Sequence, residues 1–167
     1  MPIPFDTRAP RASDIPALAT IADANLFPGE MLEGMMTPTL EGSGDDVWRV
    51  VSQDDVPVGF AFAQPEALTD RTWNLRAIAV RPDLHGSGAG TALIAAMEAA
   101  LAQSPLLVID TAQLLDQYRA RRFYGARGYA KVAAIPGFFG AEVDKVTVVK
   151  TMLWGERVQR GGPCALT

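Results

Sequence analysis

A glycine-rich run near the middle of the chain is the segment whose residue types and spacing point most clearly to chemistry. It reads His85-Gly86-Ser87-Gly88-Ala89-Gly90-Thr91 and lies between a predicted strand and a predicted helix. Glycines in such a turn leave backbone N–H groups free to converge on an anion at the positive end of the helix. The run therefore predicts a pyrophosphate site, and the alternative is that its glycines only make a tight turn.

Two other phosphate-binding motifs fit this run poorly. A P-loop needs a lysine that reaches the outer phosphates, and no lysine occurs between Met1 and Ala130. A dinucleotide-binding turn needs a third small residue where Thr91 stands, although Asp110 falls about where the ribose-binding acid would lie. Both motifs are therefore disfavoured.

Two segments of the chain together resemble the GNAT superfamily of acyl-CoA-dependent N-acyltransferases. Ala79-Val80-Arg81-Pro82, followed by the glycine-rich run, is similar to the family's acyl-CoA signature, with His85 where Gln or Arg is usual. A later helix and turn are similar to the family's second conserved segment, with Gln117 in place of the common Asn. The positions that match in this second segment are Gln117, Ala120, Phe123, Tyr124, Gly128 and Tyr129. The resemblance covers about Thr7 to Leu153.

The resemblance implies that acetyl-CoA is the co-substrate. Cys164 is the only cysteine, so no CxxC metal site can be built, and we expect no metal. The main chain of Ile78, Ala79 and Val80 is then expected to meet the pantetheine arm and the thioester carbonyl. Gly86 to Thr91 are expected to hold the pyrophosphate, with His85 and Gln117 as further cofactor contacts.

The two catalytic candidates are Tyr124, which the resemblance suggests, and Asp110, which is chosen for its place at the end of a strand beside the loop. The Tyr124 phenol is expected to give its proton to the departing thiolate, and the alternative is a core aromatic beside Phe123. Asp110, at the end of a predicted strand, is expected to help deprotonate the amine, directly or through water. Alternatively, Asp110 caps a helix or pairs with an arginine, and ordered water removes the proton.

No residue of the chain offers a better-supported nucleophile. There is no GxSxG elbow, His85 is the only histidine, and the only cysteine, Cys164, lies in the C-terminal tail. We therefore expect direct acetyl transfer in a ternary complex rather than through an acyl-enzyme.

The acceptor is expected between the N-terminal helices and the late strands, where the resemblance places the substrate. Apolar walls with a few carboxylates suit a primary amine of a small molecule or peptide. Alternatively, these side chains only close the core. The candidates are Phe27, Glu30, Met31, Phe138 and Phe139.

Two other functions remain open on the sequence alone. One is a non-catalytic acyl-CoA-binding sensor or interaction domain that keeps the fold without turnover. The other is transfer to a protein N-terminus or lysine, which the acidic charge would favour for basic acceptors. The sequence leaves open the acceptor, the acyl-chain preference and whether the protein forms a homodimer.

The composition is that of one globular domain. The chain has 167 residues, 49% of them apolar and 20% charged, so it can bury a core without disulfides or metals. A net charge of -4 argues against a nucleic-acid groove, which needs a surplus of Lys and Arg. No apolar run approaches the roughly 20 residues of a membrane span, and no signal peptide is visible, so we expect a cytoplasmic protein without membrane contact.

The elements that must position these residues follow from hydrophobic periodicity and turn residues. We expect an α/β (α+β) fold in a single domain over residues 1–167, with residues 154–167 as a tail. The resemblance implies a central mixed, mostly antiparallel sheet of about seven strands, flanked by about four helices. The predicted strands are Thr7–Ala12, Val47–Ser52, Val56–Gln64, Thr72–Val80, Leu106–Asp110, Tyr129–Ile135 and Val143–Leu153. The predicted helices are Ser13–Ala24, Glu30–Met36, Gly90–Leu101 and Asp116–Ala126.

Overall fold

The sheet has seven strands, as predicted, in the order β1-β2-β3-β4-β5-β7-β6. A computed structural model describes residues 4–113 and 118–152 of the chain. The strands are β1 (Asp6–Arg8), β2 (Val47–Gln53), β3 (Val56–Pro65), β4 (Trp73–Val80), β5 (Leu106–Ala112), β6 (Ala130–Gly140) and β7 (Val143–Thr151).

Within the described residues, four α-helices and three 3-10 helices accompany the sheet. Contacts between residues group the chain into two compact units. The first contains the described residues of Met1–Pro65 and Leu75–Leu101, and the second those of Glu66–Asn74 and Ala102–Thr167. The α-helices are α1 (Ile15–Asn25), α2 (Leu32–Leu40), α3 (Ala89–Ala100) and α4 (Tyr118–Gly125), and the 3-10 helices are η1 (Ala12–Asp14), η2 (Gly29–Met31) and η3 (Pro82–Leu84).

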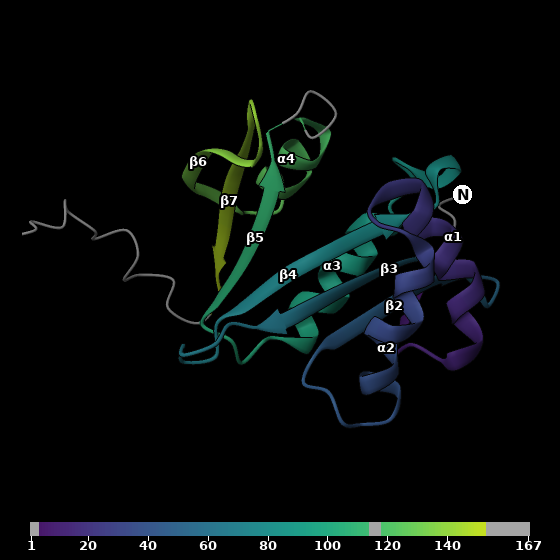
Figure 1. Cartoon of the computed structure of the whole chain (residues 1–167). Helices are drawn as coiled ribbons and strands as arrows, with labels where there is room; N and C mark the ends of the chain where they lie inside the picture. Colours follow the sequence, from purple (N-terminus) through teal and green to yellow (C-terminus); the bar gives the residue numbers. More distant parts are fainter. Residues whose placement is uncertain (1–3, 114–117, 153–167) are drawn as a thin grey trace, which may run out of the picture. The chain divides into compact units, whose positions relative to one another are not determined.

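In the first unit, helices cover both faces of the sheet. α1 and α2 lie on one face, and α3 lies on the other (Figure 1). Strand β3 alternates large and small residues, so Phe60 and Phe62 point to the face of α1 and α2, opposite to Ala61. The Trp48 ring stacks on Phe62 with centroids 4.4 Å apart. The core on this face includes Leu18, Ile21, Leu32, Met36, Trp48, Phe60 and Phe62.

Asp14 joins the first strand to the first helix. Its carboxylate accepts hydrogen bonds from both terminal guanidinium nitrogens of Arg8, at 2.7 and 2.8 Å, and from the N–H of Arg11 at 2.8 Å. Burial alone raises the pKa of Asp14, but these hydrogen bonds and the positive charges outweigh it and lower the pKa overall. The charged carboxylate therefore stabilises the start of α1.

In the second unit, β7 pairs antiparallel with both β5 and β6. The register places Asp110 directly opposite Thr147 and Ile135 opposite Lys145. After α4, the chain turns with Gly128 at φ +86°, a conformation typical of the residue that follows a helix. The amides of Arg127 and Tyr129 both donate to the carbonyl of Tyr124, at 3.0 and 3.2 Å. These bonds hold the end of α4 in place.

Three predicted boundaries were wrong. The first strand ends at Arg8 rather than Ala12, because the capping turn around Asp14 already begins at Arg11. Helix α2 runs on to Leu40 although it contains Pro38, and Glu41 continues its hydrogen bonding to the carbonyl of Thr37. Strand β6 continues past Ile135 to Gly140, because a sheet-edge strand tolerates the missing N–H of a proline such as Pro136.

Residues 114–117 and 153–167 lie outside the described chain. They include Gln117, the end of the last predicted strand, the predicted tail and Cys164. In the part that is described, no helix is long and apolar enough to cross a membrane.

Candidate functional site

The glycine-rich loop leads from the end of β4 into α3 within the first unit. After η3, Gly86 and Gly88 adopt φ angles of +80° and +100°, which L side chains rarely adopt. Gly88 is the N-cap of α3, and its carbonyl accepts the N–H of Ala92 at 3.0 Å. The two glycines are therefore required by the backbone conformation of the loop.

The space beside this loop is open. A Cβ atom added at Gly86 or Gly88 would meet no other atom within 4 Å. The first N–H groups of an α-helix lack acceptors inside the helix, so those of Ala89 and Gly90 suit an external anion. Local bonds hold the turn, because both the amide and the hydroxyl of Ser87 donate to the carbonyl of Leu84, at 3.1 and 2.6 Å. The loop fits a phosphate or pyrophosphate group.

At the end of β4, the groups able to meet a ligand belong to the main chain. The side chains of Ala79 and Val80 are buried, and that of Ile78 is partly buried. A Cβ at Gly59 would lie 2.6 Å from the carbonyl oxygen of Ala79, so β3 needs a glycine there for its close approach to β4. The carbonyl of Val80 accepts a hydrogen bond from Nε2 of His85 at 3.0 Å.

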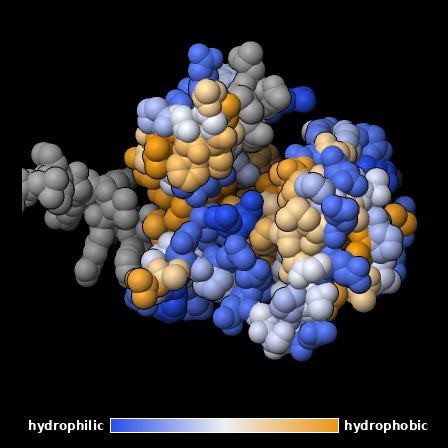
Figure 2. Space-filling model, in the orientation of Figure 1, coloured by the Kyte–Doolittle hydropathy of each residue, from blue (hydrophilic) through white to orange (hydrophobic). Residues whose placement is uncertain are grey.

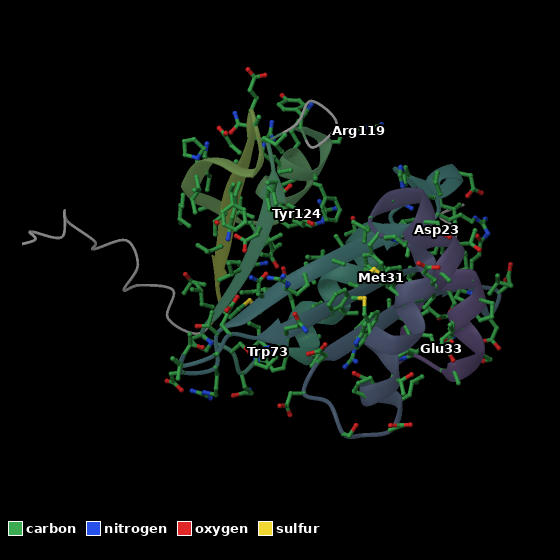
Figure 3. The ribbon with its side chains drawn as sticks, viewed as in Figure 1. Asp23, Met31, Glu33, Trp73, Arg119 and Tyr124 are labelled. Atoms are coloured by element: carbon green, nitrogen blue, oxygen red, sulfur yellow. The ribbon has the colours of Figure 1, made fainter. Side chains whose placement is uncertain are left out.

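Tyr124 lies on α4 in the second unit, where Figure 3 labels it. Its ring packs edge-on against Phe123 and Tyr129, with centroids 5.4 and 5.8 Å away. The side chain is buried, and burial raises the pKa of the phenol well above its ordinary value. Tyr124 therefore keeps its proton at neutral pH, as a proton donor must.

Asp110 lies at the centre of a polar cluster in the second unit, formed by Asp110, Asn74, Thr147 and Lys145. The Thr147 hydroxyl donates to one carboxylate oxygen at 2.7 Å. The Lys145 ammonium lies 3.1 Å from the other oxygen, and the Asn74 amide donates to that oxygen at 3.3 Å. Asn74 also donates to a carboxylate oxygen of Glu66 at 2.8 Å.

The charge state of Asp110 follows from these contacts. Burial alone raises its pKa, but the hydrogen bonds from Thr147, Lys145 and Asn74 outweigh burial and lower the pKa overall. Asp110 is therefore held as an anion. The same donors hold its carboxylate oxygens in place and lower its basicity.

The predicted acceptor residues are distributed over both units. In the first unit, Phe27 packs edge-on against Phe60, 6.3 Å away, and is partly buried against the core. The Glu30 and Met31 side chains are exposed, and Figure 3 labels Met31 near the start of α2. Of these three, Glu30 and Met31 are accessible to a substrate.

In the second unit, apolar side chains are exposed on the β6–β7 hairpin (Figure 2). Phe138 and Phe139 are both about half exposed, and their rings meet edge-on at 4.9 Å. The Lys145 ammonium lies 4.5 Å from the centre of the Phe138 ring. Lys145 thus contacts both Asp110 and a predicted acceptor residue.

The structure brings the predicted cofactor residues Ile78 to Val80 and His85 to Thr91 together in one unit, and it groups Tyr124 with Asp110 in the other. Sequence reasoning missed Asn74 and Thr147 as partners of Asp110. These contacts follow from the strand pairing, which sets Asp110 opposite Thr147. No residue type in the sequence specifies that register, so the sequence offered no signal for them. Among the described residues, no group of three His, Cys, Asp or Glu side chains could hold a metal ion.

Residues 43–131 match the family model described as an acetyltransferase (GNAT) domain, and they make up more than half of the chain. The chain belongs to the GNAT acetyltransferase family. This confirms the resemblance found in the sequence. A comparison with curated proteins gives no match.

Solved structures of this family share the fold. A GNAT-family protein from Desulfovibrio desulfuricans has a TM-score of 0.82 at 22% identity, over 89% of this chain and 99% of its own. The ribosomal-protein-S18-alanine N-acetyltransferase from Escherichia coli has a TM-score of 0.72 at 18% identity, over 92% and 98% of the two chains. An aminoglycoside 6'-N-acetyltransferase solved with coenzyme A has a TM-score of 0.74 at 18% identity, over 89% and 97%. At these identities, the similarity shows the GNAT fold.

Proposed function

We propose that this GNAT acetyltransferase takes the acetyl group from acetyl-CoA and passes it directly to a primary amine of a small molecule or peptide. The observation that carries the proposal is the loop between β4 and α3. Two glycines with positive φ, open space beside them and the start of a helix together form a cradle for a pyrophosphate. The coenzyme A complex of the aminoglycoside 6'-N-acetyltransferase supports the choice of ligand.

In the proposed reaction, the amine nitrogen bonds to the thioester carbonyl carbon as the carbon–sulfur bond breaks. The sulfur leaves as a thiolate and must gain a proton. We assign this proton to Tyr124, whose buried phenol is protonated at neutral pH. The matching motif around Tyr124 in the family's second segment supports this role.

The amine must also lose a proton. We propose that Asp110 accepts it, directly or through water, because the hydrogen bonds to its carboxylate keep it charged and an anion stabilises the cation that forms nearby. We further propose that Phe27, Glu30, Met31, Phe138 and Phe139 contact the acceptor. The acceptors named for the similar structures, an alanine of a ribosomal protein and an aminoglycoside, both present amines.

Thermal unfolding with acetyl-CoA, free CoA and NAD tests the cofactor. A ligand that binds only the folded state raises the midpoint, so both CoA species should raise it and NAD should not. Gly88→Glu should abolish the shift, because a carboxylate there repels the pyrophosphate. Gly42→Glu is the matched control, since Gly42 also has a positive φ of +70° and open space, away from the loop.

A screen of amines for release of the CoA thiol then tests transfer. Thiol release that depends on an amine would establish the activity. No midpoint shift with CoA, or a shift with NAD, would refute the acetyltransferase proposal. CoA binding without transfer to small amines, peptides or basic proteins would instead favour a sensor.

A further inference from the structure

The His85 side chain links the glycine-rich loop to the end of β4. Its Nε2 atom lies 3.0 Å from the carbonyl oxygen of Val80. A carbonyl oxygen only accepts hydrogen bonds, so Nε2 must carry the proton and donate it. The geometry thereby specifies the tautomer of the neutral imidazole.

The bond connects two backbone segments that are fixed independently. On the strand side, the N–H of Arg81 donates to the carbonyl of Val58 at 2.8 Å, and Gly59 allows close packing against Ala79. On the loop side, the amide of His85 donates to the carbonyl of Pro82 at 3.3 Å. The imidazole therefore spans the η3 turn and ties its far end back to the strand.

The other bonds of this turn are local. The amide of Leu84 donates to the carbonyl of Arg81 at 2.9 Å, and Arg81 forms a bidentate, exposed pair with Asp83. Such bonds shape the turn within itself. The contact between His85 and Val80 is the side-chain bond that joins the far end of this turn to β4.

We propose that His85 is a positioning residue that fixes the spacing between the end of β4 and the glycine-rich loop. This inference rests on the proposed function, in which β4 meets the pantetheine arm and the loop holds the pyrophosphate of one acetyl-CoA molecule. A ligand that spans both segments depends on their spacing, whereas a ligand that uses the loop alone does not.

Two substitutions separate positioning from general structure. His85→Gln keeps an N–H donor at about the reach of Nε2, whereas His85→Asn is too short to meet the Val80 carbonyl. A neutral hydrogen bond contributes about a three- to tenfold factor to an equilibrium. We therefore expect His85→Asn to weaken acetyl-CoA binding about three- to tenfold by calorimetry, and His85→Gln to stay close to the wild type.

The nucleotide half of coenzyme A, which ends at its pyrophosphate, provides the discriminating measurement. It should bind the wild type and both variants equally, because it does not reach β4. Equal weakening of both ligands in His85→Asn would mean that the loop itself is distorted, and it would overturn the proposal. Unchanged acetyl-CoA binding in His85→Asn would also overturn it. So would an equal loss of acetyl-CoA affinity in His85→Asn and His85→Gln.

Nuclear magnetic resonance of the unmodified protein gives a test that needs no variant to fold. His85 is the only histidine in the sequence, so its ring nitrogen signals need no assignment by mutation. The neutral ring should show the Nε2–H tautomer, and an Nδ1–H tautomer would overturn the proposal. If the wild type binds neither acetyl-CoA nor the nucleotide half, the proposed function fails instead, which distinguishes the two failures.

Discussion

In the glycine-rich loop the polar groups belong to the backbone of consecutive residues, whereas around Asp110 they belong to side chains from separate strands. The loop needs Gly86 and Gly88 because of their positive φ angles. The Asp110 cluster needs Thr147 and Lys145 because of their donors. The comparison shows that one region depends on chain conformation and the other on charge, so different substitutions should disable them.

The two regions also differ in what they offer a reaction. Backbone N–H groups at a helix start bind an anion whatever the pH, because they do not titrate. Tyr124 and Asp110 are titratable. Burial raises the pKa of Tyr124, and hydrogen bonds lower the pKa of Asp110, so near neutral pH the tyrosine stays protonated and the aspartate stays charged. We therefore expect substitutions in the loop to change affinity and substitutions in the second unit to change turnover or acid stability.

The largest effect is expected for Tyr124→Phe. Loss of a positioned proton donor lowers kcat by about 100-fold, while the KM for acetyl-CoA stays unchanged. The ring contacts with Phe123 and Tyr129 remain, so the unfolding midpoint should hardly move. Steady-state kinetics with varied acetyl-CoA measures both constants.

Tyr118→Phe is the matched control, because Tyr118 lies on the same helix with its side chain 56% exposed. Because burial raises the pKa of Tyr124, its phenol stays protonated at pH values near the ordinary tyrosine pKa. Deprotonation of Tyr124 should therefore not lower the activity in that range. An unchanged kcat in Tyr124→Phe would show that Tyr124 is not the proton donor. It would also remove the expected difference between the loop, which affects affinity, and the second unit, which affects turnover.

A smaller effect is expected for Asp110→Asn. Removing the charge leaves Lys145 without its counter-ion, which should lower the free energy of unfolding by about 1–3 kcal/mol at neutral pH. The folded pKa of Asp110 is lowered, so its contribution is present above the unfolded pKa and is lost as pH falls through the folded value. The wild type and the variant should therefore converge in stability at acid pH.

Urea unfolding at several pH values between neutral and acid measures this convergence. Asp45→Asn, at an exposed aspartate of the first unit, should leave the stability of the protein nearly unchanged at every pH. A difference between Asp110→Asn and wild type that persists at acid pH would show that geometry, rather than charge, makes the cluster stable.

The smallest effect is expected for Gly86→Ala. A Cβ meets open space at this position, so the cost is the positive φ alone, about 1 kcal/mol of stability. Gly42→Ala, with φ +70° and equally open space, should cost about the same. Only Gly86→Ala should also weaken acetyl-CoA binding, as measured by calorimetry. Equal affinities in the two variants would mean that the loop tolerates strain without losing its ligand.

The order of the elements was predictable because each depends on local patterns. The β-rich run of β3 and the helix formers of α3 predicted both elements to within a residue or two. The first strand was predicted to continue past Pro10, but it ends at Arg8. The ion pair between Arg8 and Asp14, six positions apart, belongs to a capping turn that strand propensity does not predict. Strand β6 was cut short because Pro136 breaks most strands but is tolerated at the edge of a sheet.

The sequence by itself determined the glycine-rich loop, since glycines at the start of a run of helix formers predict a tight turn at a helix start. It also determined the family, because the motif residues lie close together along the chain. Only the tertiary structure decided the partners of Asp110 and the bond between His85 and Val80. Those contacts depend on strand register and on the path of a turn, and both are set by the packing of the sheet rather than by the residues that make the contact.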